Sequence, residues 1–367
     1  MRLTIPQDRF ADALGTVSRA VSPKNTIPAL AGVHVRATPG RLLLRATDLE
    51  LAIERTVEAE VHEPGEAILP ARYLADLVRK IPFGDVDLEV KDGQPVAAVR
   101  WGKSHYTIHG FPAADFPDIP AVSGPSFRVD RGAFRELIRQ TAFAAAQEEA
   151  RPYLKGVFLT LAGSELLGVA TDSIRIATTR VPADNPENQS LQVIVPGRSL
   201  QELARLLAGA EDEEPLRVSA EPNQVSFDLG DIRVISRLLE GQYPDVLRLI
   251  PTSYPTRARL DRSQFLEAID RAQVLSRDGS LRFSVGPEQL VITGATPEVG
   301  QVYEEVPLVL EGDPLDIGFN ARYLTEGLRA MDDREFWFEF SGSRNPARIR
   351  PAEGDGYVYV VLPLVTF

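Results

Sequence analysis

Apolar and polar residues alternate along much of this chain, with the period of two that is typical of β-strands with one buried face. The alternation is clearest in six stretches, at 41–61, 85–90, 215–220, 224–229, 231–239 and 335–341. A second pattern, with apolar residues three and four positions apart, predicts amphipathic helices at 8–20, 71–81, 131–147, 197–208, 262–277 and 321–331. Together the patterns predict an α+β fold in which helices pack on mainly antiparallel sheets.

The same order of elements recurs three times along the chain. Ala-Thr pairs that are 124 and 125 residues apart mark the three copies at 46–47, 170–171 and 295–296. Arginines in the first turn of the second helix of each copy keep offsets of 126 and 124 and are Arg72, Arg198 and Arg322. Landmarks in one order at nearly constant spacing indicate an internal repeat. We therefore expect three homologous domains with two helices each, at 1–121, 122–252 and 253–367.

The composition excludes several classes of protein. The 367 residues are 44% hydrophobic and 25% charged, as in ordinary globular proteins. The absence of cysteine excludes disulfides, thiolate metal sites, iron–sulfur clusters and cysteine nucleophiles. No window approaches the roughly 18 apolar residues of a membrane helix, and the first ten residues lack the apolar core of a signal peptide. We therefore expect a cytoplasmic protein that contacts no membrane.

The formal net charge of −12 is unevenly distributed. Because nucleic-acid binders are usually basic, this total by itself argues against one. The six predicted helices, counted without Glu148 and Glu149, nevertheless carry +7 together and leave −19 on the rest of the chain. Arginines on a solvated face would explain any single helix. For six helices against an acidic remainder, a shared basic surface that holds a phosphate backbone is the better interpretation.

Motifs of catalysis and metal binding are missing from the sequence. His105 and His109 would share one strand face but lie roughly 13 Å apart, too far to bind one metal ion. There is no P-loop, dinucleotide-binding or nucleophile-elbow motif. Asp48 and Asp172 recur after Ala-Thr, but the third copy has Pro297 there, so we interpret both as turn formers. We expect no catalytic residue, no metal and no cofactor.

Nine stretches of the sequence resemble one known family. In chain order they are TIPALAGVHV, LLLRATDLELAI, LPARYL, PAADFPDIP, ARPYLKGV, GVATDSIRIA, EGQYPDVLRLIP, IGFNARYL and YVYVVLPL. They are spread along the chain, which over essentially its whole length resembles the bacterial DNA polymerase III beta subunits, the sliding clamps. The resemblance implies a homodimer joined head to tail into a ring of six similar domains, with helices around a central hole and sheets on the outer rim.

The resemblance also implies a function without catalysis. The ring would enclose double-stranded DNA regardless of its sequence and tether the catalytic subunit of DNA polymerase III, which makes replication processive. It would dock the clamp loader, other polymerases and repair proteins through a short hydrophobic motif. Its place would be the cytoplasm, at the nucleoid and the replication fork. Helices that face phosphates make salt-dependent contacts that permit sliding.

In this family the motif is bound in a hydrophobic cleft between the second and third domains. Matching motifs place the cleft here at Leu154, Thr171, Ser173, Ile174, Arg175, Ile176, Pro244, Arg248, Leu249, Pro346, Val360, Val361, Leu362, Pro363 and Leu364, with Arg151 and Tyr153 beside it. Ile174 replaces a common histidine, and Leu362 and Leu364 replace methionines. These changes keep the cleft apolar but remove adaptable thioethers. The chain ends in Val365-Thr366-Phe367, one residue beyond the commonest form.

The resemblance places two further sites. At the subunit interface, the strand with Tyr106 and Ile108 would meet Val274 and Leu275 of the other protomer, which would protect an apolar strand edge from aggregation. The DNA contacts would fall on Lys24, Arg72, Arg79, Lys80, Arg135, Arg139, Tyr153, Arg198 and Arg205. Two other classes stay open. One is an acidic protein–protein scaffold that does not enclose DNA, and the other is a carbohydrate- or nucleotide-processing enzyme with an unrecognised site.

Overall fold

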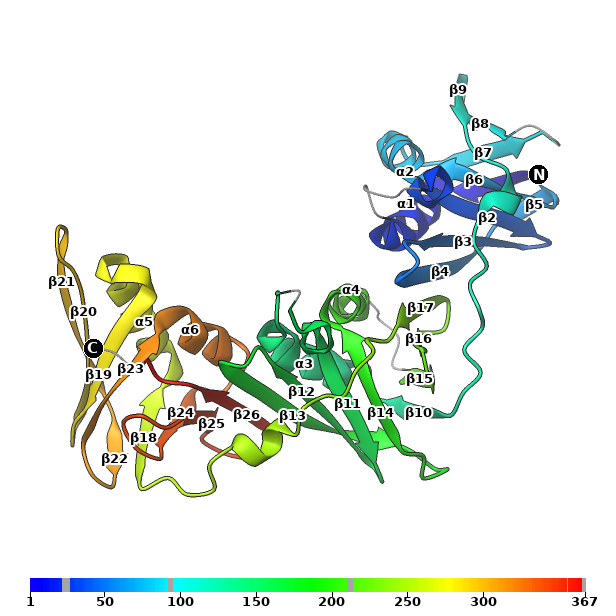
Figure 1. Cartoon of the computed structure of the whole chain (residues 1–367). Helices are drawn as coiled ribbons and strands as arrows, with labels where there is room; N and C mark the ends of the chain where they lie inside the picture. The colour runs from blue at the N-terminus through cyan, green and yellow to red at the C-terminus, as the bar shows by residue number, and fades with distance from the viewer. Residues whose placement is uncertain (22–26, 92–94, 149, 210–213, 355, 365–367) are drawn as a thin grey trace. The chain divides into compact units, whose positions relative to one another are not determined.

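The structure is a computed structural model that describes residues 1–21, 27–91, 95–148, 150–209, 214–354 and 356–364. The chain divides into two compact units, both drawn in Figure 1. The first unit comprises Met1–Arg131, Asp184–Pro186 and Arg205–Leu238, and the second comprises Gly132–Ala183, Glu187–Ala204 and Leu239–Phe367. None of the helices that the described residues form is long and apolar enough to span a membrane.

Two α-helices lie in each third of the chain, among the residues that the structure describes. They are α1 (Gln7–Val17), α2 (Ala71–Lys80), α3 (Arg131–Thr141), α4 (Gly197–Ala208), α5 (Arg262–Ala272) and α6 (Ala321–Arg329). The predicted helices are confirmed, but α1, α3 and α5 end earlier than predicted and continue as 3-10 turns. In α3 the Thr141 hydroxyl donates to the Leu137 carbonyl, and such a bond distorts the last helical turn.

The strands of the first unit are paired antiparallel in two sets. One set is a five-stranded sheet in the order β5 (Glu60–Glu63), β1 (Arg2–Pro6), β7 (Asp85–Val90), β8 (Val96–Trp101) and β9 (Ser104–His109). The other set runs in the order β10 (Ser126–Val129), β15 (Leu216–Glu221), β16 (Gln224–Asp228), β17 (Ile232–Arg237), β4 (Leu51–Glu58), β3 (Arg41–Thr47), β2 (Gly32–Thr38) and β6 (Gly65–Pro70). β9 is therefore an edge strand of its sheet.

The strands of the second unit also form two antiparallel sets. The longer set runs in the order β14 (Leu191–Pro196), β11 (Gly156–Ala162), β12 (Glu165–Thr171), β13 (Arg175–Asp184), β26 (Tyr357–Val361), β25 (Ala347–Pro351), β24 (Glu335–Phe340), β18 (Thr256–Asp261) and β22 (Val309–Glu311). The shorter is a four-stranded sheet in the order β21 (Gly300–Pro307), β20 (Gln289–Thr296), β19 (Ser280–Val285) and β23 (Leu315–Asn320). β21 is an edge strand of this sheet.

The helices bury their apolar faces against these sheets. Phe10, Phe134 and Phe265 occupy the same place in α1, α3 and α5, and all three are fully buried. The ring of Phe265 lies 5.6 Å from that of Phe336, centre to centre, within a cluster of tilted aromatic rings. Figure 1 shows α5 and α6 side by side in the last third of the chain. The α+β fold with two helices in each repeat is thereby confirmed.

Two strand pairs join the modules, as we call the three copies of the sequence repeat. At the first junction β17 pairs with β4, with Ser236 opposite Leu51. At the second junction β26 pairs with β13, with Val361 opposite Arg175. Leu51 and Arg175 are 124 residues apart, and Ser236 and Val361 are 125 residues apart, so both spacings match the repeat. The two junctions are thus copies of each other, residue for residue.

Candidate functional site

A tight turn between β12 and β13 presents Ile174 at the second junction. The Thr171 hydroxyl donates to the Arg175 carbonyl at 2.5 Å, and one carboxylate oxygen of Asp172 accepts from the amides of Ile174 and Arg175 at 3.0 and 3.1 Å. Ser173 takes a φ of +78°, which turns the chain sharply. These bonds confirm Asp172 as a turn former, and they leave the Ile174 side chain 40% exposed.

The segment after β26 lies against this turn. The Leu362 amide donates to the Ile174 carbonyl at 2.9 Å, and the Leu364 amide donates to the Gly318 carbonyl at 2.8 Å. Leu362 is 43% exposed and Leu364 is half-buried. The structure therefore brings together Ile174 and Leu362, two apolar side chains that are far apart in the sequence and open to solvent.

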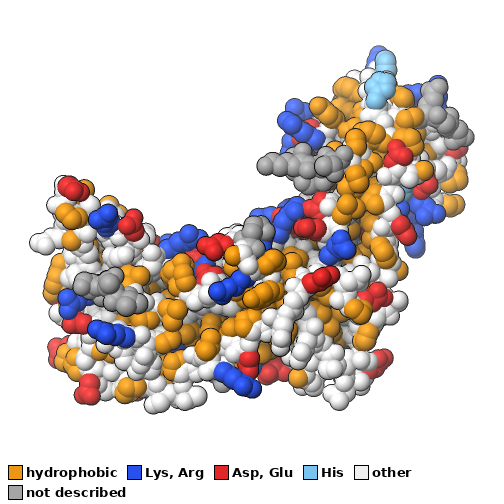
Figure 2. Space-filling view, viewed as in Figure 1, with side chains coloured by type: hydrophobic (Ala, Val, Ile, Leu, Met, Phe, Trp, Pro, Cys, Tyr) orange, Lys and Arg blue, Asp and Glu red, His pale blue; other side chains and the backbone are white. Residues whose placement is uncertain are grey.

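A cluster of buried apolar residues forms the floor next to these two side chains. It consists of Leu154, Val169, Ile176, Ile194, Tyr243, Val246 and Val360. The Phe158 ring stacks on that of Tyr243 at 5.0 Å, and Tyr153 packs against the cluster. Figure 2 shows exposed hydrophobic side chains over this part of the second unit. Exposed apolar side chains above a packed apolar floor form a surface suited to a short hydrophobic peptide.

Arg175 lies under this surface rather than on it. Its guanidinium donates to Asp172 at 3.0 Å and to the Phe143 carbonyl at 2.8 Å, and it forms an ion pair with Glu326. The cation also stands over the Tyr323 ring, 4.9 Å from the ring centre. Arg175 therefore ties the turn to the end of α3 and to α6, and its role is to position the neighbouring residues.

The charge of this buried arginine is stabilised by its surroundings. Burial by itself lowers the pKa of Arg175, but Tyr359, Glu326 and Asp172 raise it above the value of a free guanidinium. Burial also disfavours the charged form of Glu326 and so raises its pKa, but hydrogen bonds from Arg322 and Arg175 outweigh burial and leave the pKa lowered. Both groups of the ion pair are therefore charged at neutral pH, so the turn keeps its anchor.

The other predicted cleft residues differ in exposure. Thr171 and Val361 are buried, whereas Leu249 is 65% exposed on the 3-10 helix Val246–Leu249. Arg248 is exposed and bridges to Asp245 at 2.6 Å. Several predicted residues remain open to solvent at least in part, namely Arg151, Ser173, Pro244, Pro346 and Pro363. Arg151 donates to the Ser173 hydroxyl at 2.9 Å, which places a cation beside the turn.

Basic residues follow the helices of both units. The exposed ones among those predicted to contact DNA are Arg72, Arg79 and Lys80 on α2, Arg135 on α3, and Arg198 and Arg205 on α4. Arg139 is half-buried and engaged by Glu136 and Asp332, and the Glu136 hydrogen bond is the main cause of its raised pKa. Lys24 lies outside the described residues. Of the predicted cations that the structure describes, all but the half-buried Arg139 are thus exposed on helix surfaces, and Arg79 forms an ion pair with Asp76 at 2.6 Å.

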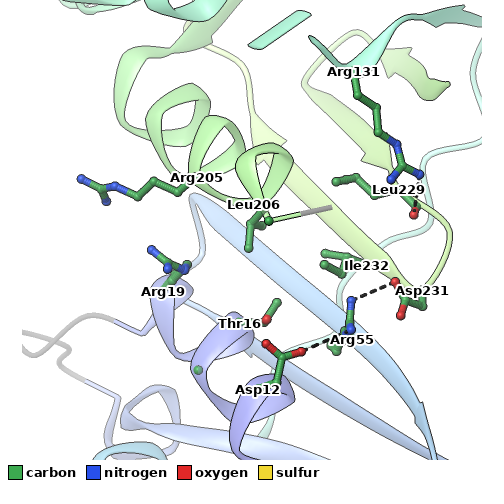
Figure 3. A pocket seen from close by; sticks show the side chains of 12 residues that line it. Asp12, Thr16, Arg19, Arg55, Arg131, Arg205, Leu206, Leu229, Asp231 and Ile232 are labelled. Carbon is green, nitrogen blue, oxygen red and sulfur yellow. Dashed lines mark hydrogen bonds and ion pairs between the residues drawn. The ribbon is translucent and has the colours of Figure 1, made fainter. Parts of the chain in front are cut away.

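A basic pocket lies beside Arg205 in the first unit, as Figure 3 shows. Its volume is about 490 Å³, and Arg19, Arg55 and Arg131 line it together with Arg205. Asp12 and Asp231 offset part of this charge through ion pairs with Arg55 at 3.3 and 2.8 Å. Figure 3 shows the Arg19 and Arg205 side chains extending to the same side of the pocket. Four arginines against two acids leave a net positive lining.

Exposed apolar residues lie on the edge strand β9 and on the 3-10 turn that follows α5. Tyr106 on β9 is 41% exposed, and Ile108 is half-buried. In the second unit, Val274 after α5 is 77% exposed, and Leu275 is half-buried. The edge of β9 that carries Tyr106 can therefore accept a further strand, and its contact with Val274 and Leu275 of another subunit stays a prediction.

Known protein families account for this arrangement of modules and surfaces. Models of the N-terminal, central and C-terminal domains of the DNA polymerase III beta subunit match residues 1–120, 128–245 and 247–365. The chain belongs to the DNA polymerase III beta subunit family. The family predicted from the sequence motifs is therefore confirmed.

Similar beta subunits match the full length of the chain. The beta sliding clamps of Staphylococcus epidermidis and Staphylococcus aureus are each 33% identical over 380 residues, which cover 100% of this chain and of theirs. The solved DNA polymerase sliding clamp from Bacillus subtilis has a TM-score of 0.96 at 32% identity and covers 100% of both chains. The C. crescentus beta sliding clamp has a TM-score of 0.95 at 33% identity, and the match covers 100% of this chain and 99% of that one.

Membership in the beta subunit family establishes the general function. The chain is a sliding clamp for DNA replication, and it belongs with non-catalytic processivity factors rather than with enzymes. The enzyme and the acidic scaffold, both left open by the residues alone, are not favoured by these matches.

Within this beta subunit, the floor of the peptide surface was only partly predicted. The sequence identified Leu154, Ile176 and Val360, but it did not identify Val169, Ile194, Tyr243 or Val246. Tyr243 and Val246 belong to the stretch EGQYPDVLRLIP, which resembles the family. Their apolar side chains on either side of Pro244-Asp245 were the available signal.

Proposed function

We propose that two copies of this chain join head to tail through β9 and β21 into a ring of six modules that encloses double-stranded DNA. The observation that supports this proposal is that β9 and β21 each have one edge that pairs with no other strand of the described residues, whereas the modules within the chain are joined by strand pairing. The matches to the family models support domains at 1–121, 122–252 and 253–367. The ring would act in the cytoplasm, at the nucleoid and the replication fork.

The internal repeat predicts the register of the subunit interface. β8 and β9 pair Val96 with His109, as β16 and β17 pair Gln224 with Arg237, so β9 corresponds to β17 with an offset of 128 residues. β20 and β21 form an antiparallel pair like that of β12 and β13, so β21 corresponds to β13. Transferring the register of the two junctions places Tyr106 opposite Val302 of the partner subunit, and Ile108 opposite Gly300 of the partner subunit.

A side-chain contact at the second junction supports the same interface. Phe143 lies after α3, and its ring is 5.7 Å from that of Tyr359 on β26. Val274 follows α5 at the position that Phe143 has after α3, and Tyr106 corresponds to Tyr359 through the repeat. Tyr106 of one subunit would therefore pack on Val274 of the other, with Leu275 next to it. The predicted interface residues form one consistent contact.

The helices provide the surface for DNA. The proposed contacts are Arg72, Arg79, Lys80, Arg135, Arg139, Tyr153, Arg198 and Arg205, together with Lys24. Exposed guanidinium and ammonium groups spread over several helices bind phosphates without reading the bases, so the contacts are weak, salt-dependent and compatible with sliding. Enclosure in the ring, rather than affinity, would keep the clamp on its template.

The surface at the second junction would bind partner proteins. Ile174, Leu362 and Leu249 are exposed beside the apolar floor, which suits the short hydrophobic motif of the polymerase III catalytic subunit, the clamp loader, other polymerases and repair proteins. Pseudomonas aeruginosa has a homologous clamp that was solved bound to griselimycin. The remaining predicted cleft residues would form its walls or, like Arg175, hold the walls from below.

The enclosure of DNA is tested with the full chain. Light scattering is expected to give about 80 kDa, twice the 40.3 kDa of one chain. Nicked circular DNA should retain the protein once a clamp loader and ATP are supplied, and cutting the circle should release it because a ring slides off free ends. A monomer, or release that does not depend on cutting, contradicts the ring and favours an acidic scaffold that does not enclose DNA.

A further inference from the structure

A pocket at the first junction repeats the backbone of the peptide surface at the second junction. The Thr47 hydroxyl donates to the Leu51 carbonyl at 2.9 Å, as Thr171 does to Arg175. Leu49 takes a φ of +77°, almost the +78° of Ser173. The turn that shapes the second-junction cleft is therefore present a second time in the chain, between β3 and β4.

The strand that closes each cleft is repeated as well. The Arg237 amide donates to the Glu50 carbonyl at 2.8 Å, as the Leu362 amide does to the Ile174 carbonyl at 2.9 Å. Ile235 lies opposite Ala52, as Val360 lies opposite Ile176. The same hydrogen bond therefore follows the same strand pair at both junctions.

These elements line a half-open hollow of about 80 Å³, which we call the first-junction pocket. Pro117 and Asp118 line it, at the place in the repeat that Pro244 and Asp245 have at the second junction. Leu49, also in the lining, is 46% exposed. The volume exceeds several-fold what a single water needs, so the pocket has room for one small aliphatic side chain.

The two clefts differ in charge at equivalent positions. Glu50 stands where the second junction has Ile174, and Arg237 stands where it has Leu362. Glu50, Arg237 and Asp118 are exposed, and none of them forms a side-chain ion pair with another residue of the described parts of the chain. Two carboxylates and one guanidinium leave the rim of the first-junction pocket with a net charge of −1. An unpaired acidic rim around an apolar hollow suits a ligand with a cation next to an apolar group.

We propose that the first-junction pocket is a second peptide site, which takes an extended segment of a partner protein with one aliphatic anchor flanked by lysine or arginine. The anchor would enter the hollow beside Leu49, and a flanking cation would pair with Glu50 and Asp118. The proposal rests on the proposed function of the second-junction cleft in one respect, namely that the two sites share the same backbone arrangement. The side chains that line the first-junction pocket are different ones. One clamp chain would thus bind two peptide classes at once.

The test uses two fluorescent peptides on the full dimeric chain. One is a basic probe, Gly-Lys-Leu-Lys-Gly-Ser, and the other is a polymerase-tail peptide with the short hydrophobic motif. Glu50→Lys is expected to weaken binding of the basic probe at least tenfold and to leave the tail peptide unaffected, because only the first pocket loses its acid. Leu362→Ala is expected to do the reverse. Glu50 is exposed, so its replacement leaves the fold intact, which a thermal melt verifies.

Glu288→Lys provides the matched control, because Glu288 is exposed and its replacement changes the net charge equally. The proposal is overturned if the basic probe does not bind at millimolar concentration, if Glu288→Lys weakens it as much as Glu50→Lys does, or if Leu362→Ala abolishes its binding. Failure of the tail peptide to bind the unaltered chain would instead contradict the proposed second-junction cleft. The two failures are therefore distinguishable.

Discussion

His34 shows how one buried titratable residue is held in its neutral form. The ring is 2% exposed and stacks on Phe116 with centres 4.9 Å apart. Arg45 donates to its Nδ1 at 3.3 Å, and Glu66 lies 3.3 Å from its Nε2, a pattern that fits the neutral tautomer with the proton on Nε2. Burial and the Arg45 charge lower the pKa of His34 to about 4, against the opposing effect of Glu66.

This lowered pKa predicts a loss of stability in mild acid. The unfolded chain binds a proton at His34 near pH 6.5, whereas the folded chain does so only near pH 4. The stabilisation is therefore present above pH 6.5 and is lost as the pH falls towards 4. Between pH 7 and pH 4.5 the free energy of unfolding of the unaltered chain is expected to fall by about 2 kcal/mol more than that of His34→Gln, which has no titrating group at position 34. Thermal unfolding at both pH values measures the difference.

Direct titration of the ring provides the independent check. The His34 ring proton, followed by NMR, is expected to shift only as the pH approaches 4. A midpoint near pH 6.5, or an equal acid sensitivity of His34→Gln and the unaltered chain, would show that the burial of this ring has no consequence for stability.

At the scale of single elements, α6 depends on a glycine for its packing against β26. A Cβ added at Gly327 would lie 2.4 Å from the Tyr359 ring, and the Tyr357 hydroxyl donates to the Gly327 carbonyl at 2.9 Å. Alanine normally stabilises a helix interior by about 1 kcal/mol relative to glycine. Here the overlap with a buried ring is expected to dominate, so Gly327→Ala should lower the free energy of unfolding by about 1–3 kcal/mol. Thermal unfolding of the full chain measures this change.

Gly15 in α1 supplies the matched control. It is exposed, and a Cβ added there would meet no atom within 4 Å. Gly15→Ala is therefore expected to raise the free energy of unfolding by about 0.5–1 kcal/mol, opposite in sign to Gly327→Ala. Equal effects of the two substitutions would mean that the contact between α6 and β26 does not determine the result.

Elements were easier to predict from the sequence than their ends or their side-chain partners. The apolar spacing predicted α4 with its ends, but in α3 it continued to Ala145 because alanines of the following 3-10 turn are also buried. The burial of Arg175 could not be predicted, since Asp172, Phe143 and Glu326 come from three separate segments. Local patterns encode single elements, whereas such contacts depend on the fold that brings the segments together.

At the scale of the whole molecule, one kind of strand junction serves twice within the chain and, in the proposed ring, a third time between chains. Both internal junctions are held together by the covalent chain, which keeps the paired strands at high effective concentration. Ion pairs near each junction add to the strand pairing, such as Arg55–Asp231 and Arg175–Glu326. The junction between subunits has no covalent link and is held by its contacts alone. We therefore expect dilution or a point substitution to separate this junction before the two internal ones.

Tyr106→Asp is expected to separate the subunits without unfolding them. Tyr106 lies at the edge of its sheet and is 41% exposed in the single chain, so the monomer tolerates a carboxylate there. In the dimer that carboxylate would be buried against Val302 and Val274 of the partner subunit, and burying an unpaired charge is costly. Sedimentation is expected to show a dimer dissociation constant raised at least a hundredfold, a change that corresponds to about 3 kcal/mol. Val309→Asp is the control, since this residue on β22 is 56% exposed and outside the proposed interface. A Tyr106→Asp chain that remains dimeric and is still retained on nicked circular DNA would contradict the transferred register.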